Sequence, residues 1–128
     1  MLGMRTYTKK YIAACRAKVE KDISTYRSAN AKTLESTFFN NMVIVLDHLF
    51  VHRLRTVEGK DGNPLNEVRL LSDSIMNNNY KMTLDKTIKY DPTQSVLKYE
   101  EGKEIKVSEA DFVSLSKAFF GEIESKFL

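Results

Sequence analysis

The chain has 128 residues, of which 42% are hydrophobic and 29% charged, and it contains only five glycines and two prolines. This composition excludes a disordered or fibrous protein, and the length is enough for one hydrophobic core but not for two independent ones. The net charge of +3 is too small to indicate, by itself, a dedicated nucleic-acid-binding protein.

The first two predicted helices lie in residues 4–58, which contain neither glycine nor proline and therefore favour helix. Apolar residues at spacings of three and four predict an amphipathic helix at about residues 8–28. The pattern at about residues 33–57 is apolar nearly all round in its middle, which is typical of a central helix or a subunit contact and predicts a homodimer. Residues 28–31 separate the two helices in one interpretation, and an unbroken helix of about 50 residues is the alternative.

A capped helix follows after a short glycine-containing turn. Asn63 before Pro64 provides a capping side chain and a first-turn proline, so this third helix is predicted at about residues 64–77. Because the connecting loop has only about five residues, the second and third helices are expected to be antiparallel neighbours.

The rest of the chain predicts a short hairpin and a last helix. Alternating apolar residues on both sides of Gly102 predict a β-hairpin at about residues 96–107. Ser108 and the acidic residues after it are typical of a helix start, and they predict a helix at about residues 109–127. We therefore expect residues 1–128 to form a mainly α, four-helix bundle-like single domain, with a small hairpin or extended segment between the third and fourth helices.

Polar and basic residues gather where the second and third predicted helices join, which makes this junction the candidate ligand site. Amide groups at a helix start attract an anion, and arginine side chains bind phosphate or carboxylate with two parallel hydrogen bonds. A small anionic ligand is one interpretation, and a purely local structural role for each residue is the other. The candidate ligand-binding residues are Arg53, Arg55, Lys60, Asn63, Asn66 and Arg69.

Two histidines offer a second kind of site. His48 and His52 are four residues apart, so on a continuous helix they share one face and can present two imidazoles to a divalent metal. Asp61 and Glu67 are the carboxylates that could complete the site, which would make the protein a metal-binding bundle or a metal-dependent hydrolase. Leu49 stands where zinc proteases have a glutamate. The alternative, in which the histidines are structural, leads us to expect no cofactor.

The first predicted helix carries a surplus of basic residues. Residues 1–33 have a net charge of +6, whereas the remaining residues have a net charge of −3. This helix either lies against acidic surfaces of the same fold or a second copy, or it binds nucleic acid weakly. The first alternative is favoured, because several acidic residues could neutralise the basic face.

The sequence favours a cytoplasmic protein that does not enter a membrane. Cys15 is the single cysteine, so an intramolecular disulfide is excluded and nothing indicates an oxidising compartment. Residues 1–10 lack a continuous apolar signal segment. The longest apolar run, residues 42–46, is far shorter than the about 20 residues of a membrane span.

Residues 50–69 read FVHRLRTVEGKDGNPLNEVR, and residues 119–127 read FFGEIESKF. These stretches resemble short uncharacterised bacterial proteins of the actinobacteria, over most of the chain. The resemblance implies a bacterial, cytoplasmic protein and no particular activity. We therefore expect a non-enzymatic binding or interaction protein, with metal-dependent chemistry and weak nucleic-acid binding as the alternatives.

Overall fold

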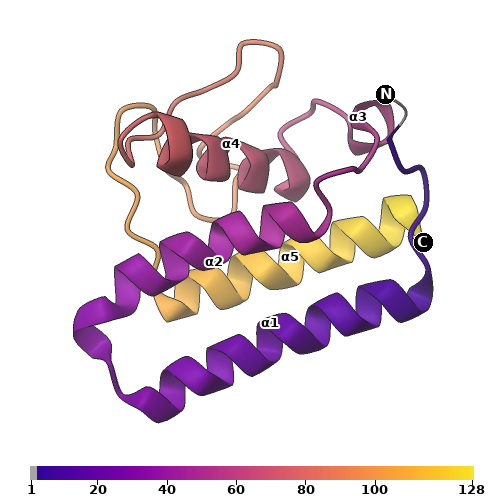
Figure 1. Ribbon diagram of the computed structural model, residues 1–128. Helices are drawn as coiled ribbons and strands as arrows, with labels where there is room; N and C mark the ends of the chain where they lie inside the picture. Colours follow the sequence, from indigo (N-terminus) through magenta and orange to yellow (C-terminus); the bar gives the residue numbers. More distant parts are fainter. Residues whose placement is uncertain (1–2) are drawn as a thin grey trace.

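Six helical segments make up the computed structural model, which describes residues 3–128 (Figure 1). In chain order they are α1 (Lys9–Ala29), the 3-10 helix η1 (Lys32–Leu34), α2 (Glu35–Leu49), α3 (Arg55–Glu58), α4 (Pro64–Asn77) and α5 (Glu109–Phe127). Helices α2 and α5 lie in the middle, with α4 packed on one side and α1 on the other. The predicted fold class, a mainly α and bundle-like single domain, is confirmed.

Capping side chains mark the helix ends. Thr8 at α1, Asn63 at α4 and Ser108 at α5 each accept a hydrogen bond from a backbone N–H of the first turn. Asn30 ends α1 in the left-handed conformation, with φ of 51°, so α1 and α2 are separate helices. The first, third and fourth predicted helices agree with α1, α4 and α5 to within one residue at each end.

The apolar residues around α2 are covered by other helices of the same chain. Phe39, Val43 and Leu46 are fully buried, and α2 packs against both α4 and α5. A second copy of the chain is not needed to cover this helix. The apolar breadth of α2 therefore no longer supports a homodimer, which stays a prediction. None of the helices in residues 3–128 has the length and apolar character that a bilayer crossing requires.

The second predicted helix, at about residues 33–57, is corrected at its C-terminal end, because α2 stops at Leu49. Arg53 caps this end: its Nη1 donates hydrogen bonds to the backbone carbonyls of Asp47 at 3.4 Å and Phe50 at 3.0 Å. The same carbonyls accept the backbone N–H groups of Phe50 and Arg53, three residues further on, instead of at the four-residue spacing of an α-helix. The prediction missed the stop because hydrophobic periodicity does not show where an arginine side chain donates.

The predicted hairpin at about residues 96–107 is also corrected, since no residue in the part of the chain that the structure describes belongs to a β-strand. The backbone N–H groups of Val96 and Leu97 donate instead to the carboxylate of Glu67, each at 2.8 Å. The second half of the expected hairpin pairs with the segment after α4 in an isolated antiparallel bridge. The side chain of Glu67 therefore accepts backbone N–H groups from the segment that was expected to form the first strand of the hairpin.

Replacing Gly62 by alanine is expected to lower the free energy of unfolding by about 1–3 kcal/mol more than replacing Gly102 does. The two glycines have φ of 88° and 87°, so both variants carry the same left-handed strain. A methyl group at Gly62 would overlap the backbone carbonyl of Lys89, whereas nothing lies within 4 Å of one at Gly102. Urea unfolding of both variants measures the difference, and equal losses would contradict the contact.

Candidate functional site

Arg53 lies in the interior, at the junction of α2, α3 and α4. Its side chain is fully buried, and it donates hydrogen bonds to the carboxylates of Glu58 and Asp47, each at 2.9 Å. Its remaining N–H groups donate to backbone carbonyls of Asp47, Phe50 and Leu65. All five donors of the guanidinium are therefore used inside the protein, which leaves none for a ligand.

Glu58 is the anion that this junction already contains. Its buried carboxylate accepts hydrogen bonds from Arg53, Arg69 and Asn66. Burial by itself would raise the pKa of Glu58, but the hydrogen bond from Arg69, the charges of both arginines and the amide of Asn66 hold that pKa below its ordinary value. The carboxylate of Glu58 thus accepts hydrogen bonds from three of the residues that were predicted to bind an anionic ligand.

Four of the six predicted ligand residues serve the junction itself, namely Arg53, Asn63, Asn66 and Arg69. Among them, Asn63 caps α4 and also donates to the backbone carbonyl of Glu58 at 2.8 Å. The other two, Arg55 and Lys60, are exposed and form no ion pair with the described residues. The fold therefore leaves the charges of Arg55 and Lys60 open to solvent.

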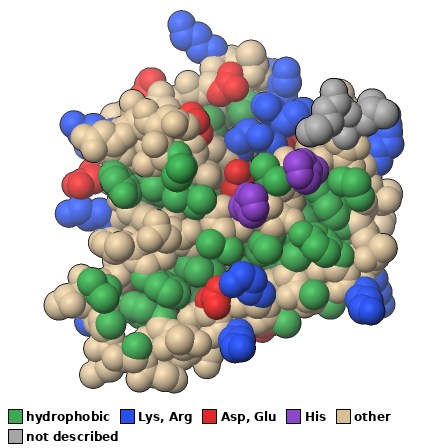
Figure 2. Space-filling model, viewed as in Figure 1, with side chains coloured by type: hydrophobic (Ala, Val, Ile, Leu, Met, Phe, Trp, Pro, Cys, Tyr) green, Lys and Arg blue, Asp and Glu red, His purple; other side chains and the backbone are tan. Residues whose placement is uncertain are grey.

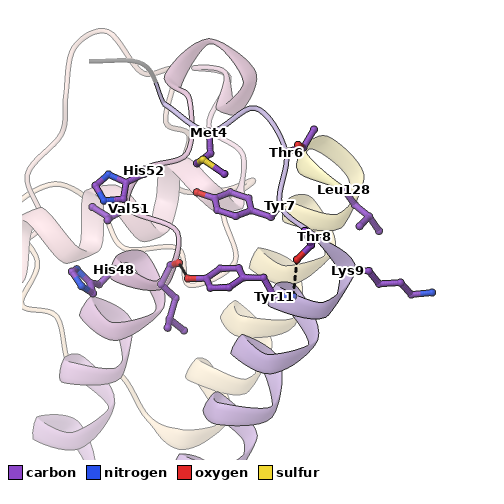
Figure 3. A pocket seen from close by; sticks show the side chains of 11 residues that line it. Met4, Thr6, Tyr7, Thr8, Lys9, Tyr11, His48, Val51, His52 and Leu128 are labelled. Carbon is purple, nitrogen blue, oxygen red and sulfur yellow. Dashed lines mark hydrogen bonds between the residues drawn. The ribbon is translucent and has the colours of Figure 1, made fainter.

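His48 and His52 are both exposed and line one pocket, but they do not share a helical face (Figure 3). His48 lies in the last turn of α2, which ends at Leu49, and His52 lies in the turn that follows. Asp61 and Glu67 do not line this pocket. In the described part of the chain, no group of three or more His, Cys, Asp or Glu side chains is placed to hold a metal ion.

Asp61 and Glu67, the carboxylates that were predicted to bind a metal, accept hydrogen bonds from loop residues instead. Glu67 is buried and accepts the N–H groups of Val96 and Leu97, and burial raises its pKa despite these hydrogen bonds. Asp61 is exposed and accepts a hydrogen bond from Asn63 at 2.8 Å, which is the main cause that lowers the pKa of Asp61. Glu67 thus ties the loop before α5 to α4, and Asp61 stiffens the turn between α3 and α4.

A pocket of about 890 Å³ opens between the N-terminal segment, the start of α1 and the end of α2 (Figure 3). We call it the N-terminal pocket. Most of its wall is apolar or aromatic, and none of the described side chains that line it is acidic. The lining residues are Met4, Thr6, Tyr7, Thr8, Lys9, Tyr11, His48, Leu49, Val51, His52 and Leu128. Both histidines therefore belong to one site, although in a different setting from the one predicted.

Tyr7 and Tyr11 form the aromatic wall of the N-terminal pocket. Their rings stack with centroids 5.6 Å apart, and both meet the ring of Phe50 edge-on, at 4.9 Å and 5.5 Å. The hydroxyl of Tyr11 donates a hydrogen bond to the backbone carbonyl of Leu49, which joins α1 to the end of α2 (Figure 3). Burial and a hydrogen bond with Cys15 raise the pKa of Tyr11 to about 12.

The hydroxyl of Tyr7 is an unmet hydrogen-bonding group in this wall. Its oxygen is buried and has no partner among the described residues. Figure 3 shows it pointing toward the side of the pocket that holds Val51 and His52. A buried hydroxyl without a partner costs about 1–3 kcal/mol.

The sequence did not indicate Met4, Tyr7, Tyr11 or Leu128 as site residues. They come together through long-range contacts, such as the hydrogen bond from the backbone N–H of Tyr7 to the carbonyl of Phe127 at 2.6 Å. One local signal was present, because two tyrosines four residues apart at a helix start predict neighbours on one face. Nothing local predicts what lies opposite them.

A second pocket, of about 320 Å³, adjoins the N-terminal pocket and shares Val51 and His52 with it. We call it the arginine pocket, and its lining residues are Gly3, Val51, His52, Arg53, Leu54, Arg55, Thr56 and Arg69. No described acidic side chain is part of this lining. On the face in Figure 2, basic side chains gather above the two histidines and hydrophobic side chains lie below them.

Basic residues of α1 pair with acidic residues of the same fold. Arg16 forms an ion pair with Glu124, and Arg27 forms one with Glu109, so both reach across to α5. The intramolecular alternative therefore accounts for these two arginines. Weak nucleic-acid binding through α1 stays a prediction.

No family model, curated protein or solved structure matches this chain. We therefore infer the function from the geometry and chemistry of the chain's own residues. Of the features above, the N-terminal pocket and the adjoining arginine pocket offer space and chemical groups that the fold does not itself use.

Proposed function

We propose that this protein is a non-enzymatic binding protein whose N-terminal pocket holds a small, largely apolar organic molecule. The gathering of exposed hydrophobic side chains at this pocket carries the proposal. Eight large hydrophobic residues are exposed in the described part of the chain, and half of them line the pocket: Met4 (47%), Tyr11 (41%), Val51 (42%) and Leu128 (57%). Hydrophobic surface concentrated in one hollow is typical of a binding site.

The aromatic wall is held in place before any ligand binds. Phe50 supports the rings of Tyr7 and Tyr11 from below, and the carbonyl of Leu49 holds the hydroxyl of Tyr11. A wall that is already ordered loses little side-chain entropy on binding, so more of the contact energy remains as affinity. The pocket volume of about 890 Å³ lies within the usual range of small-molecule sites, about 300–1,000 Å³.

A few polar groups stand in this apolar lining, as is usual where a ligand is held in one orientation. They are the hydroxyls of Thr6 and Thr8, the imidazoles of the two histidines and the ammonium group of Lys9, which points away from the pocket in Figure 3. The preferred ligand is therefore mostly apolar and carries at least one polar group.

Replacing Val51 by glutamate is expected to weaken the binding of a neutral apolar probe by about tenfold or more. Val51 lines the pocket and is 42% exposed, so a carboxylate there puts a charge against the apolar wall without burying it in the core. The probe is N-phenyl-1-naphthylamine, whose fluorescence rises when it leaves water. A fluorescence titration of the parent and the variant measures the two dissociation constants.

Met76→Glu is the matched control. Met76 is 63% exposed and lies outside the N-terminal pocket, so this variant makes the same change in charge elsewhere. Its dissociation constant is expected to stay within about twofold of that of the parent. An equal loss in both variants, or no binding of the probe by the parent protein, contradicts the proposal.

A further inference from the structure

We infer that the ligand of the N-terminal pocket carries an anionic head, a phosphate or a carboxylate, which binds in the arginine pocket while the apolar body lies against the tyrosines. This inference rests on the proposed function, because the apolar body needs the N-terminal pocket. The two pockets have Val51 and His52 in common, so a single molecule can extend from one into the other. Hydrophobic and basic side chains lie on opposite sides of the two histidines on the face in Figure 2.

The arginine pocket holds one arginine that forms no ion pair with the described residues. Arg53 pairs with Asp47 and Glu58, and Arg69 pairs with Glu58, so two buried or half-buried carboxylates balance two arginines. Arg55 is exposed and forms no ion pair with the residues that the structure describes. Its guanidinium is therefore free to bind an oxyanion, which arginine does with charge-assisted hydrogen bonds.

Arg69 adds a donor to the same pocket. Its Nε and Nη2 donate to the carboxylate of Glu58 at 3.1 Å and 2.6 Å, whereas Nη1 donates to none of the described residues. The side chain is 23% exposed, so its outer edge faces solvent although its inner edge is engaged. Arg55, Arg69 and His52 all line this one pocket. An anionic head would thus meet donors from three separate segments.

Another hollow, of about 390 Å³, is bordered by Arg55 and Arg69 as well. The acidic residues that line it are Asp47, Asp73 and Asp85. Hydrogen bonds from Thr87 lower the pKa of Asp85 most, and the charges of Arg55 and Lys60 lower it further. The charge of Asp85 therefore acts on three cations, Arg55, Lys60 and Arg69, and Asp85 does not line the arginine pocket.

Three probes with one alkyl chain and different heads test the inference on the intact protein. Decyl phosphate, decanoate and 1-decanol are each titrated against bound N-phenyl-1-naphthylamine, below their critical micelle concentrations. The two anionic probes are expected to bind about tenfold more tightly than decanol, since a hydrogen bond to a charged group is stronger than one to a hydroxyl. A tighter phosphate identifies a phosphate head, and equal anionic affinities identify a site for any small oxyanion.

Arg55→Ala is the deciding variant. It is expected to reduce the advantage of the anionic probes to about twofold, mainly by weakening their binding, while the affinity for decanol changes by less than about twofold. Because Arg55 is exposed and unpaired within the described residues, this change should leave the fold intact. Lys21→Ala is the control, since it also removes one exposed positive charge, on the outer face of α1, and it is expected to leave the advantage unchanged.

Three results separate the possible failures. If decanol displaces the probe but the anionic molecules bind no better, the inference is overturned and the proposed function stands. If His48→Ala removes the anionic advantage and Arg55→Ala does not, the head lies inside the N-terminal pocket and the inference is again overturned. If neither N-phenyl-1-naphthylamine nor decanol binds, the proposed function fails, and the inference fails with it.

Discussion

Replacing Glu58 by glutamine is expected to lower the free energy of unfolding by about 3–5 kcal/mol, because it removes the charge that compensates buried guanidinium groups. Arg53 donates to this carboxylate at 2.9 Å and Arg69 at 2.6 Å, and neither the side chain of Glu58 nor that of Arg53 has any exposed surface. Glutamine keeps the shape and one acceptor oxygen, but it leaves Asp47 as the remaining carboxylate of the cluster. Urea unfolding of the parent and the variant at pH 7 measures the loss.

Glu101→Gln is the control for this substitution. Glu101 is exposed and outside any ion pair of the described residues, so the same chemical change there is expected to alter stability by less than about 0.5 kcal/mol. A loss below about 1 kcal/mol in the Glu58 variant would mean that the junction tolerates an uncompensated arginine, which contradicts the role given to Glu58.

The difference between the parent and the Glu58→Gln variant is also expected to shrink as the pH falls. The pKa of Glu58 is lowered in the folded protein, so its stabilising contribution is fully present above the ordinary glutamate pKa of about 4.3 and is lost as the pH falls through the folded value. Below that value the protonated side chain is neutral, as glutamine is. Urea unfolding of both proteins at several values between about pH 7 and pH 3 measures the trend, and a constant difference contradicts it.

Replacing Phe50 by alanine is expected to lower the free energy of unfolding by about 3–5 kcal/mol and to weaken probe binding in the N-terminal pocket. Phe50 has no exposed surface, and its ring meets those of Tyr7 and Tyr11 edge-on and lies within 6.0 Å of those of Phe119 and Phe120. Loss of the Phe50 ring leaves a cavity in the core and also removes the ring on which the aromatic wall packs. Urea unfolding and the fluorescence titration measure the two effects on one protein sample.

Tyr80→Ala is the control for the loss of an aromatic ring. Tyr80 is 45% exposed and lies outside the N-terminal pocket, so its removal is expected to change stability by less than about 0.5 kcal/mol and to leave probe binding unchanged. If Phe50→Ala lowers stability but leaves the probe affinity intact, the tyrosine wall does not depend on Phe50 and the ordered-wall argument is contradicted.

Local signals in the sequence were enough to determine most of the helices. Thr8, Asn63 and Ser108 cap the helices that follow them, and a capping side chain acts on backbone groups within one turn of itself. The apolar spacing of three and four likewise identified the buried face of α1, including Val19 and Ile23. These features depend on neighbours in sequence, so no knowledge of the tertiary structure was required.

The sequence also identified the junction of α2 and α4 as unusual, but it did not determine what the charged residues do there. Arg53 and Arg69 donate to the same carboxylate, that of Glu58. The sequence left a local structural role open for both arginines, but it did not show that they share one buried acid. Whether an arginine binds a ligand or a buried acid depends on which groups lose contact with water, and burial is a property of the packed chain. Arg53 also caps the end of α2, which stops at Leu49, between the two histidines.

Only the tertiary structure decided the pockets. Tyr7 from the N-terminal segment, His52 from the turn after α2 and Leu128 at the C-terminal end line one hollow, although they lie far apart in the sequence. Helical periodicity reports which face of a segment is apolar, but not which faces meet or where their packing leaves space. The sequence thus determined the parts and their buried faces, whereas the packing of distant segments determined the site, because a cavity exists only where those segments fail to fill the volume between them.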